Sequence, residues 1–386
     1  MMEKLKFLTA GESHGKQLTG IIDGIPAGLK LSEDYIADQL IRRQLGHGRG
    51  KRMLIEQDRA EICSGVRFGK TIGSPITLVI PNKDWDNWKN KMSVGPSAVK
   101  TKAVTVPRPG HADLVGVEKY GFHDIRNILE RSSARETAMR VGLGSIARRL
   151  LEEIGITVGS HVVQIHKIKI LKSVTDNIKP PEINRKADKS HVRCLDQSVE
   201  EMMIETIDHA KKNGDSVGGV FDVIADGLPY GLGSYVHWNK KLHARISAAI
   251  LSINAIKGIE FGEGFASASS FGSELHDEIE YRDNKFTRLS NNAGGIEGGM
   301  SNAQRIVFSA VMKPIPTLTR PLRSVDLKTH KVVDAHKERT DTCAVPAASI
   351  IAESMLCMVL ADAVLEKFGG DSMNQLKAHM NATAKY

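Results

Sequence analysis

The chain of 386 residues is long enough for one large or two ordinary domains with a sizeable core. Charged residues make up 25% of it and hydrophobic residues 41%, a globular composition that excludes a mainly disordered chain. The net charge of +8 suits nucleic acid, a membrane surface or small polyanionic ligands, but the 5% of aromatic residues leaves little stacking surface for single-stranded nucleic acid.

The cysteines and the N-terminal stretch indicate the cellular environment in which we expect the protein. Cys63, Cys194, Cys343 and Cys357 are far apart and form no C-x-x-C pair, which predicts neither a metal site nor a disulfide framework. The N-terminal stretch has no apolar core of signal-peptide length, and we expect no apolar run long enough to span a bilayer. We therefore expect a cytoplasmic protein without a metal or a membrane.

The first predicted strand, Leu5–Thr9, runs into a glycine-flanked turn, Gly11-Glu12-Ser13-His14-Gly15. Glycine on both sides frees the backbone, so Ser13 and His14 could point into a cleft; an incidental histidine in a turn is the alternative. A second strand is expected over 19–22.

A helix is predicted from Ser32 to Arg43, because Ser32 suits an N-cap and the apolar residues share one face. A basic segment, 42–52, follows and is threaded with glycine. It is either a solvated loop or a phosphate-binding loop, and nothing apolar anchors it, so we expect it to be mobile when empty.

Residues 59–81 read as paired strands, and 82–102, with two tryptophans, as a long excursion. The turn at Phe68-Gly69-Lys70-Thr71 lacks the first glycine and the strand–loop–helix context of a P-loop, so it predicts no nucleotide site.

The stretch 105–140 concentrates candidate chemistry. Pro109-Gly110 predicts a turn that places His111 on a loop next to Asp113. Ser133 and Glu136 stand at capping-box spacing, which predicts a helix start at Ser133 and an anion site at its free N–H groups. An ordinary capped surface helix with solvated arginines is the alternative.

The rest of the chain mixes strands and helices without strict alternation. The elements expected are a helix to Ile154, a strand over 157–170, a surface insertion over 171–197, a helix over 198–213, a strand over 219–225, a helix over 241–257, a strand over 306–312 and a buried helix over 346–368. The glycine-dense segment 291–302 could approach a flat ligand closely, but it is no dinucleotide fingerprint. This order favours an α+β fold in a single large domain, 1–386.

Eight segments in order, GESHG, RRQLGHGRG, RPGHADL, ERSSARET, SINAIKG, NNAGGIEGGMSN, KPIPT and RTDTCAVPAA, resemble the chorismate synthase family in its longer bacterial form. Thr340 departs from the pattern, because many members carry histidine there. The resemblance implies a β-α-β sandwich, a homotetramer and a 1,4-anti-elimination. In that reaction 5-enolpyruvylshikimate 3-phosphate loses phosphate and a ring proton to give chorismate, with reduced FMN required but not consumed.

The resemblance also implies residue roles. His14 would protonate the departing phosphate, His111 would supply a proton near the reduced flavin, and Asp341 would take the substrate proton by way of the flavin N5. Arg43 and Arg49 match positions that bind the phosphate of NADPH, and would also hold substrate phosphate. The matching FMN contacts are Arg131, Ser132, Ser133, Asn254, Ala255, Gly298, Lys313, Pro314, Ile315, Pro316, Thr317 and Arg339.

Two other classes of function stay open on sequence grounds. A nucleic-acid-binding protein would explain the basic charge, and a net flavin-dependent oxidoreductase would explain flavin binding while consuming reductant in each turnover. The sequence also leaves open whether the chain reduces its own FMN from NADPH or depends on a separate flavin reductase.

Overall fold

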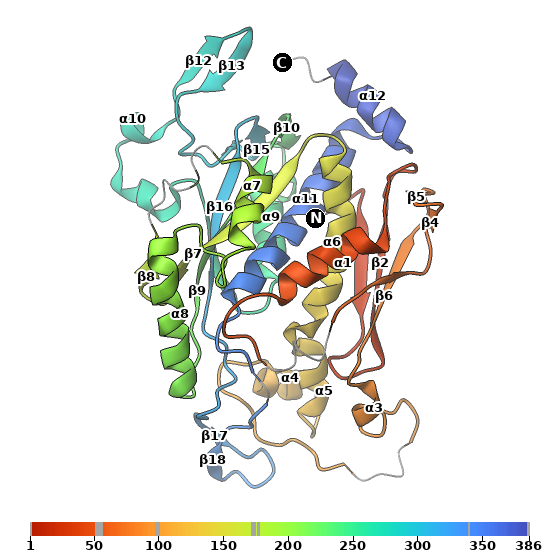
Figure 1. Ribbon diagram of the computed structural model, residues 1–386, viewed down its shortest axis with the longest axis vertical. Helices are drawn as coiled ribbons and strands as arrows, with labels where there is room; N and C mark the ends of the chain where they lie inside the picture. Colours follow the sequence, from red (N-terminus) through yellow and green to blue (C-terminus); the bar gives the residue numbers. More distant parts are fainter. Residues whose placement is uncertain are drawn as a thin grey trace.

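The computed structural model describes residues 2–50, 57–96, 101–170, 175, 178–338 and 340–383. Its main feature is a middle layer of helices between two β-sheets (Figure 1). The mixture of antiparallel sheets and helices in one domain confirms the α+β prediction and the sandwich arrangement.

The first sheet has the strand order β1-β2-β6-β3 and is antiparallel throughout. Its strands are β1 (Lys6–Ala10), β2 (Gln17–Asp23), β6 (Ile76–Pro81) and β3 (Glu61–Ile62). Alternate side chains point into the core, so Leu18, Leu78 and Ile80 are buried. The β1–β2 turn carries the predicted Ser13-His14 pair toward the end of the middle layer.

The second sheet has the order β11-β16-β9-β7-β8. Its strands are β11 (Ile256–Phe261), β16 (Ile306–Met312), β9 (Gly219–Asp226), β7 (Thr157–Ile165) and β8 (Ile168–Lys169). A small sheet beside it joins β10 (Tyr230–Gly233), β15 (Met300–Asn302) and β14 (Ile296–Glu297). The predicted strands over 219–225 and 306–312 are confirmed.

The middle layer contains α11 (Val345–Phe368), α6 (Thr137–Glu152), α1 (Glu33–Gln44) and α9 (Leu242–Leu251). The helices α6 and α11 cross closely where Gly144 lies against Ser354, because a Cβ at Gly144 would stand 2.6 Å from the Ser354 Cβ. Ser32 caps α1 as predicted, accepting from the Tyr35 N–H.

Helix α11 corrects one expectation. By length and hydropathy it is an apolar run that could cross a membrane, whereas the sequence was expected to hold none. The whole apolar stretch is buried between the two sheets, so the helix serves as the core of the fold.

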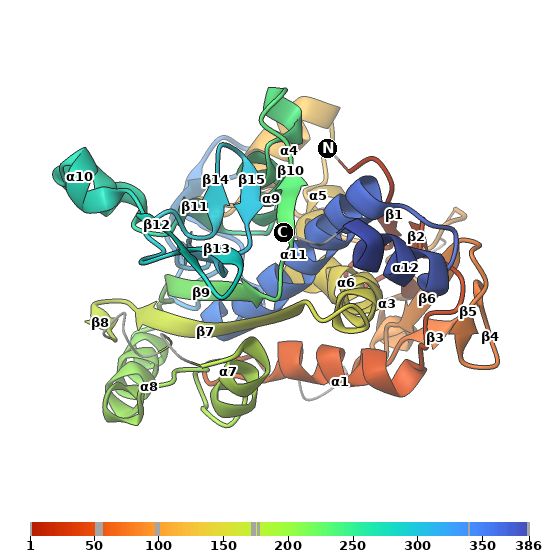
Figure 2. The ribbon, with the colours of Figure 1, turned by 90° about the horizontal axis from the view of Figure 1, so that it is seen from above.

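The segment expected to be a surface insertion is part of the packed body where it is described. Helix α7 (Pro180–Ala187) and helix α8 (Gln197–Lys212) both lie below β7 in Figure 2, and α7 packs against β7. Ile183 and Ala187 are fully buried, and the Val162 N–H donates to the Arg193 carbonyl at the edge of the sheet. The start of α8 also differs, because Asp196 caps it in place of Ser198.

Another boundary differs in the segment 241–257. The helix there ends at Leu251, and β11 begins at Ile256, since Ala255 takes a positive φ of 66° that no helix tolerates. This turn puts Asn254 and Ala255 beside the N-terminal ends of the middle helices, which is where the candidate site lies.

Smaller elements surround the sandwich. They are β4 (Val66–Arg67), β5 (Lys70–Thr71), α3 (Trp85–Trp88), α4 (Asp113–Tyr120), α5 (Arg126–Ser132), η1 (Ala134–Glu136), η3 (Trp238–Lys240), η4 (Gly264–Ser269), α10 (Gly272–Leu275), β12 (Ile279–Arg282), β13 (Lys285–Arg288), β17 (Arg323–Val325), β18 (Val332–Asp334) and α12 (Met373–Thr383). Of these, α3, α4 and α5 lie at the end of the molecule that holds the site (Figure 1).

Candidate active site

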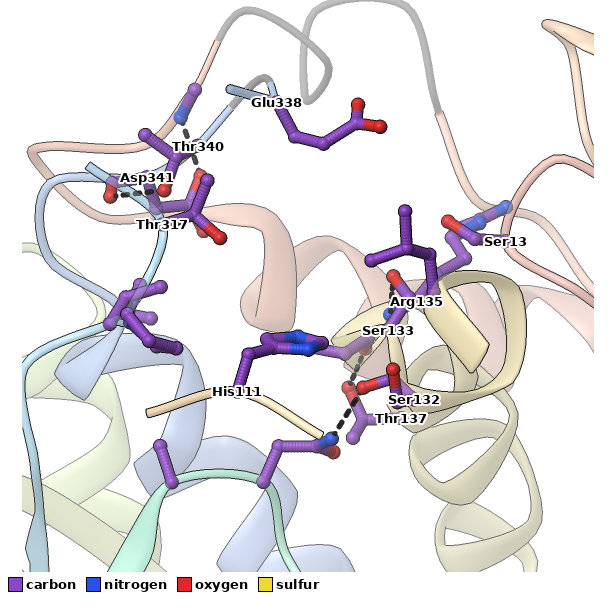
Figure 3. A pocket seen from close by; sticks show the side chains of 18 of the residues that line it. Ser13, His111, Ser132, Ser133, Arg135, Thr137, Thr317, Glu338, Thr340 and Asp341 are labelled. Atoms are coloured by element: carbon purple, nitrogen blue, oxygen red, sulfur yellow. Dashed lines mark hydrogen bonds between the residues drawn. The ribbon is translucent and has the colours of Figure 1, made fainter. Parts of the chain in front are cut away.

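One deep pocket brings together most of the residues predicted from the motifs (Figure 3). It lies where α5, η1 and α6 meet the start of α11, and the β1–β2 turn and the loop after β16 complete its walls. The predicted residues that line it are His14, Arg43, Arg49, His111, Ser132, Ser133, Asn254, Ala255, Lys313, Ile315, Pro316, Thr317 and Asp341.

His111 projects into the middle of the pocket, between Ser132–Ser133 on one side and Asp341 on the other (Figure 3). Its Nδ1 lies 2.5 Å from Oδ1 of Asp113, which is fully buried. Asp113 also accepts from the backbone N–H and the Nε of Arg108, each at 2.9 Å. Burial opposes ionisation of Asp113, but the hydrogen bonds from His111 and Arg108 outweigh it and hold its pKa well below the usual range. The carboxylate is therefore a fixed anion that orients the imidazole.

His14 is held by a second buried carboxylate. Its Nδ1 lies 3.0 Å from Oε1 of Glu130, and its backbone N–H donates to Oε2 at 2.7 Å. The imidazole stacks on the Trp88 ring with 3.9 Å between the ring centroids. Burial raises the pKa of Glu130. The hydrogen bonds and charge of His14 lower the pKa by more than burial raises it, so the pKa lies below its usual value. Both faces of the site thus carry a histidine fixed by an ionised carboxylate.

Asp341 lies at the opposite wall from Ser132–Ser133 and is linked to the glycine-threaded segment. Its Oδ2 is 3.0 Å from Nη1 of Arg49, and its Oδ1 accepts from the Gly50 N–H at 2.6 Å. The Thr342 N–H donates to the Gly48 carbonyl at 2.7 Å. Two neighbouring segments are therefore joined at the pocket wall by side-chain and backbone contacts.

These contacts correct part of the picture of a basic loop over 42–52. Arg42 and Arg43 belong to α1, and Arg43 is only 4% exposed. The described part of the loop, 45–50, is anchored by hydrogen bonds in place of apolar contacts, which the sequence could not reveal. Residues 51 and 52 lie outside the described residues, so the expected mobility of that end stays a prediction.

The helix start at Ser133 is different from a capping box. Ser133 accepts from the Arg135 N–H and caps the short turn η1, after which α6 begins at Thr137. The Glu136 carboxylate does not return to Ser133; it accepts from Thr9 Oγ1 and Arg140 Nε, both at 2.9 Å. Glu136 therefore does not cap the helix, because its carboxylate is used by stronger side-chain partners outside the turn.

Three predicted contacts are not brought into the pocket. Arg131 points outward and donates to the Thr9 carbonyl at 2.8 Å. Gly298 lies in the turn between β14 and β15, and Pro314 lies behind its neighbours in the loop after β16; neither lines the pocket. Arg339 lies outside the described residues.

The structure adds residues to which the motifs gave no role. Trp88 reaches His14 from the long excursion after β6, and Glu130 reaches it from α5. Arg108 and Arg135 are buried in the wall, and Arg126 links Glu130 to Glu338 at distances of 3.4 and 3.0 Å. Arg108, Glu130 and Arg135 lie inside the segments RPGHADL and ERSSARET and could have been found there, whereas Trp88 and Arg126 lie outside them.

The pocket can hold polyanionic ligands and move protons between fixed positions. Buried guanidinium groups provide forked donors for phosphate and carboxylate oxygens. The hydroxyl of Ser132 is buried and has no hydrogen-bond partner among the described residues, so it is poised for a ligand. Lys313 closes the loop by donating to the Gly110 carbonyl at 2.7 Å.

Comparison with known proteins places this site in a family. A family model described as chorismate synthase matches residues 5–365. A chorismate synthase from Geobacillus sp. (strain WCH70) is 52% identical over 386 residues, covering 99% of each chain, and a chorismate synthase 2 from Bacillus cereus (strain ATCC 14579) is 51% identical, covering 97% of each. The chain belongs to the chorismate synthase family.

A solved structure agrees with this assignment. The crystal structure of a chorismate synthase matches with a TM-score of 0.80 and 42% identity, covering 100% of this chain and 98% of the other. Chorismate synthases are carbon–oxygen lyases of the shikimate pathway, and this chain has that activity. The family is flavin-dependent in general, and its substrate is a small molecule. A net oxidoreductase is not favoured.

Proposed function

We propose that this pocket eliminates phosphate from 5-enolpyruvylshikimate 3-phosphate in a 1,4-anti sense, with reduced FMN bound beside the substrate, to give chorismate. The observation that carries the proposal is the convergence of two carboxylate-held histidines, an aspartate and several buried arginines on one cavity. The substrate carries one phosphate and two carboxylates, which need this many guanidinium groups to be held together.

The walls offer suitable contacts for FMN. The unpartnered Ser132 hydroxyl can hydrogen-bond to a polar ligand atom. The side-chain amide of Asn254 donates to the Ser132 carbonyl at 3.0 Å and so fixes the backbone at this position. The loop Lys313–Thr317 lies against the His111 turn through Lys313. Held by these residues, reduced FMN would supply the electron density that the elimination requires, without being consumed overall.

The residues that move protons would divide the work. His14 donates to the departing phosphate, since Glu130 and the Trp88 ring hold its imidazole in one orientation. His111, fixed by Asp113, acts as the proton donor nearest the flavin. Asp341 accepts the proton that leaves the substrate ring. The two histidines and the aspartate come from three separate segments, so no single motif contains the whole set.

The identity of the reaction can be tested by comparing the amount of flavin oxidised with the amount of chorismate formed. In a sealed anaerobic cell, photoreduced FMN and the enolpyruvyl substrate should give chorismate and phosphate over many turnovers per flavin, with the flavin still reduced at the end. Asp341→Asn should bind FMN and substrate while turnover falls by about 10²–10⁴. One flavin oxidised for each chorismate formed would reject the lyase mechanism in favour of a net oxidoreductase.

Further parts of the proposal concern assembly and supply of reductant. We infer a homotetramer in a reducing cytoplasm, where free thiols such as the exposed Cys63 persist. NADPH serves as the source of electrons, either directly at Arg43 and Arg49 or through a separate flavin reductase. Omitting the reductase from an assay with NADPH and FMN distinguishes the two routes.

A further inference from the structure

Behind the pocket wall lies a buried carboxylate to which the reaction scheme gives no role. The side chain of Asp58 is 1% exposed, and Asp58 does not itself line the pocket. Its Oδ1 lies 2.5 Å from Nη1 of Arg135, and its Oδ2 lies 3.7 Å from Nη1 of Arg43. Both arginines do line the pocket. One anion therefore stands between two cations of the binding surface, on the side away from the ligand.

The two arginines are fixed at their other nitrogens. Arg43 donates from Nε and Nη2 to the Thr137 hydroxyl at 3.2 and 2.9 Å, and from Nη2 to the Ala134 carbonyl at 3.0 Å. Arg135 donates from Nε to Oδ1 of Asn82 at 3.0 Å. The Nη1 of Arg43 is buried without a hydrogen-bond partner among the described residues, as is Oδ2 of Asp58. These two unpartnered atoms face each other at 3.7 Å, so Asp58 acts on Arg43 through its charge, whereas it both hydrogen-bonds to and neutralises Arg135.

The charges around Arg43 explain why a carboxylate is needed there. Asp58, Arg49, Arg135 and Asp341 are the charged groups that act on it. Burial lowers the pKa of Arg43 to about 10, and Asp58 is the strongest influence that opposes the fall, while Arg49 and Arg135 add to it. Without Asp58, two buried guanidinium groups would face each other with no anion between them, which disfavours both their charge and their closeness.

We propose that Asp58 is a positioning residue that holds Arg43 and Arg135 side by side, both charged, as a paired receptor for a phosphate or carboxylate group of the substrate. This inference rests on the proposed function, because it takes the pocket to be the substrate site. Asp58 touches no ligand in this scheme; it acts through the two arginines.

The test is Asp58→Asn, which keeps an oxygen acceptor for Arg135 and removes the charge. Affinity for the enolpyruvyl substrate is measured by calorimetry on enzyme loaded with oxidised FMN, so that no turnover occurs. We expect the dissociation constant to rise about 10-fold or more near neutral pH. The loss of Asp58 lowers the pKa of Arg43 further. The pH above which the variant no longer binds the substrate should therefore be lower than the corresponding pH for wild type. Asp58→Glu, which restores the charge, should bind within about threefold of wild type.

Asp188→Asn is the matched control. Asp188 also stands between two arginines, 2.7 Å from Nε of Arg42 and in an ion pair with Arg193, but none of the three lines the pocket. It should change thermal stability and leave the dissociation constant and its pH profile unaltered. Equal affinity of Asp58→Asn and wild type across the pH range, or the same loss in the control, would overturn the proposal.

Two further outcomes keep the inference separate from the proposed function. If Asp58→Asn does not fold, Asp58→Ser, which leaves room for water beside the guanidinium groups, carries the same expectation; failure of both to fold would make Asp58 a structural residue and overturn its positioning role. Inorganic phosphate is the second probe. Failure of wild type to bind the enolpyruvyl substrate rejects the proposed function, whereas equal phosphate affinity in wild type and Asp58→Asn rejects the role of Asp58.

Discussion

At the scale of residues, each proton-moving side chain of the site is fixed by a partner that does not itself react. Asp113 holds His111, Glu130 holds His14, and the Gly50 N–H holds Asp341. Such fixing matters because proton transfer requires the donor within hydrogen-bond reach of the substrate atom. The two carboxylate partners, Asp113 and Glu130, are buried and ionised, so the imidazole rings face stable charges and do not need to reorganise when the ligand binds.

Replacing either histidine by alanine therefore tests the arrangement directly. His14→Ala and His111→Ala should each lower turnover by about 10²–10⁴ while circular dichroism and thermal stability stay close to wild type. His209→Ala is the control, because His209 is exposed on α8 and does not line the pocket. Near-normal turnover in both variants at neutral pH would show that the histidines are not the proton donors.

The motifs predicted both histidines and the carboxylate beside His111, but not the residues that hold His14. His111 and Asp113 are two residues apart, so their proximity was legible in the sequence, whereas Trp88 and Glu130 reach His14 from 74 and 116 residues away. Only the packing of α3 and α5 around the β1–β2 turn creates those contacts. Arg131 shows the same limit. Its guanidinium donates to the Gly11 and Thr9 carbonyls outside the pocket lining, and local sequence does not say which residue of α5 faces the pocket.

At the scale of elements, the clearest prediction was the long helix over 346–368, because an apolar pattern around most of its circumference requires burial; the structure has it as Val345–Phe368. Helix α7 was missed because its sequence is polar and contains prolines, and its packed face consists of only Pro180, Ile183 and Ala187. The predicted end of α9 was too late, because the turn contains a positive φ at Ala255, and a positive φ is normally signalled in the sequence by glycine.

The helices are tied together by an ionic cluster around Glu353 of α11. This fully buried carboxylate accepts from both Nη atoms of Arg42 at 3.1 Å, and it pairs with Arg148 of α6 and Arg193. Burial opposes its ionisation, but Arg42, Arg148 and Arg193 more than offset this and lower its pKa to about 2. The folded-state pKa lies below the unfolded value, so this stabilisation is present above about pH 4.5 and is lost as pH falls toward 2.

Glu353→Gln should therefore destabilise the protein by roughly 3–5 kcal/mol near neutral pH, since it leaves several buried guanidinium groups without their anion. The difference from wild type should shrink as pH falls below about 4, where the wild-type carboxylate begins to take up its proton. Urea midpoints at neutral and acidic pH measure both effects. Glu182→Gln on the exposed side of α7 is the control and should stay within about 0.5 kcal/mol of wild type. A pH-independent difference would contradict the assignment.

At the scale of the whole molecule, a sandwich with helices inside leaves the outer face of the first sheet, β1-β2-β6-β3, without a covering layer. No described helix lies on the outer side of β1, β2 and β6 in Figure 1. On that side Leu8 is 70% exposed and Ile21 is 41% exposed, and the two are direct partners in the antiparallel register. Exposed apolar pairs on a regular sheet face are typical of surfaces that become buried on association.

We expect this face to contribute to the proposed homotetramer, and Leu8→Lys to weaken it. Burying one leucine side chain contributes about 1.5–3 kcal/mol, and a lysine in its place adds the cost of removing a charge from water. If this face pairs with its own copy across a two-fold axis, that interface contains the substituted residue from both copies, so these losses should shift the mass distribution to smaller species at micromolar concentration. Sedimentation velocity over a range of concentrations measures the shift. Val115→Lys is the matched control, since Val115 is 72% exposed on α4 and belongs to a different surface. A wild-type monomer would reject the tetramer itself, whereas an unchanged tetramer in Leu8→Lys would place the contacts on another face of the molecule.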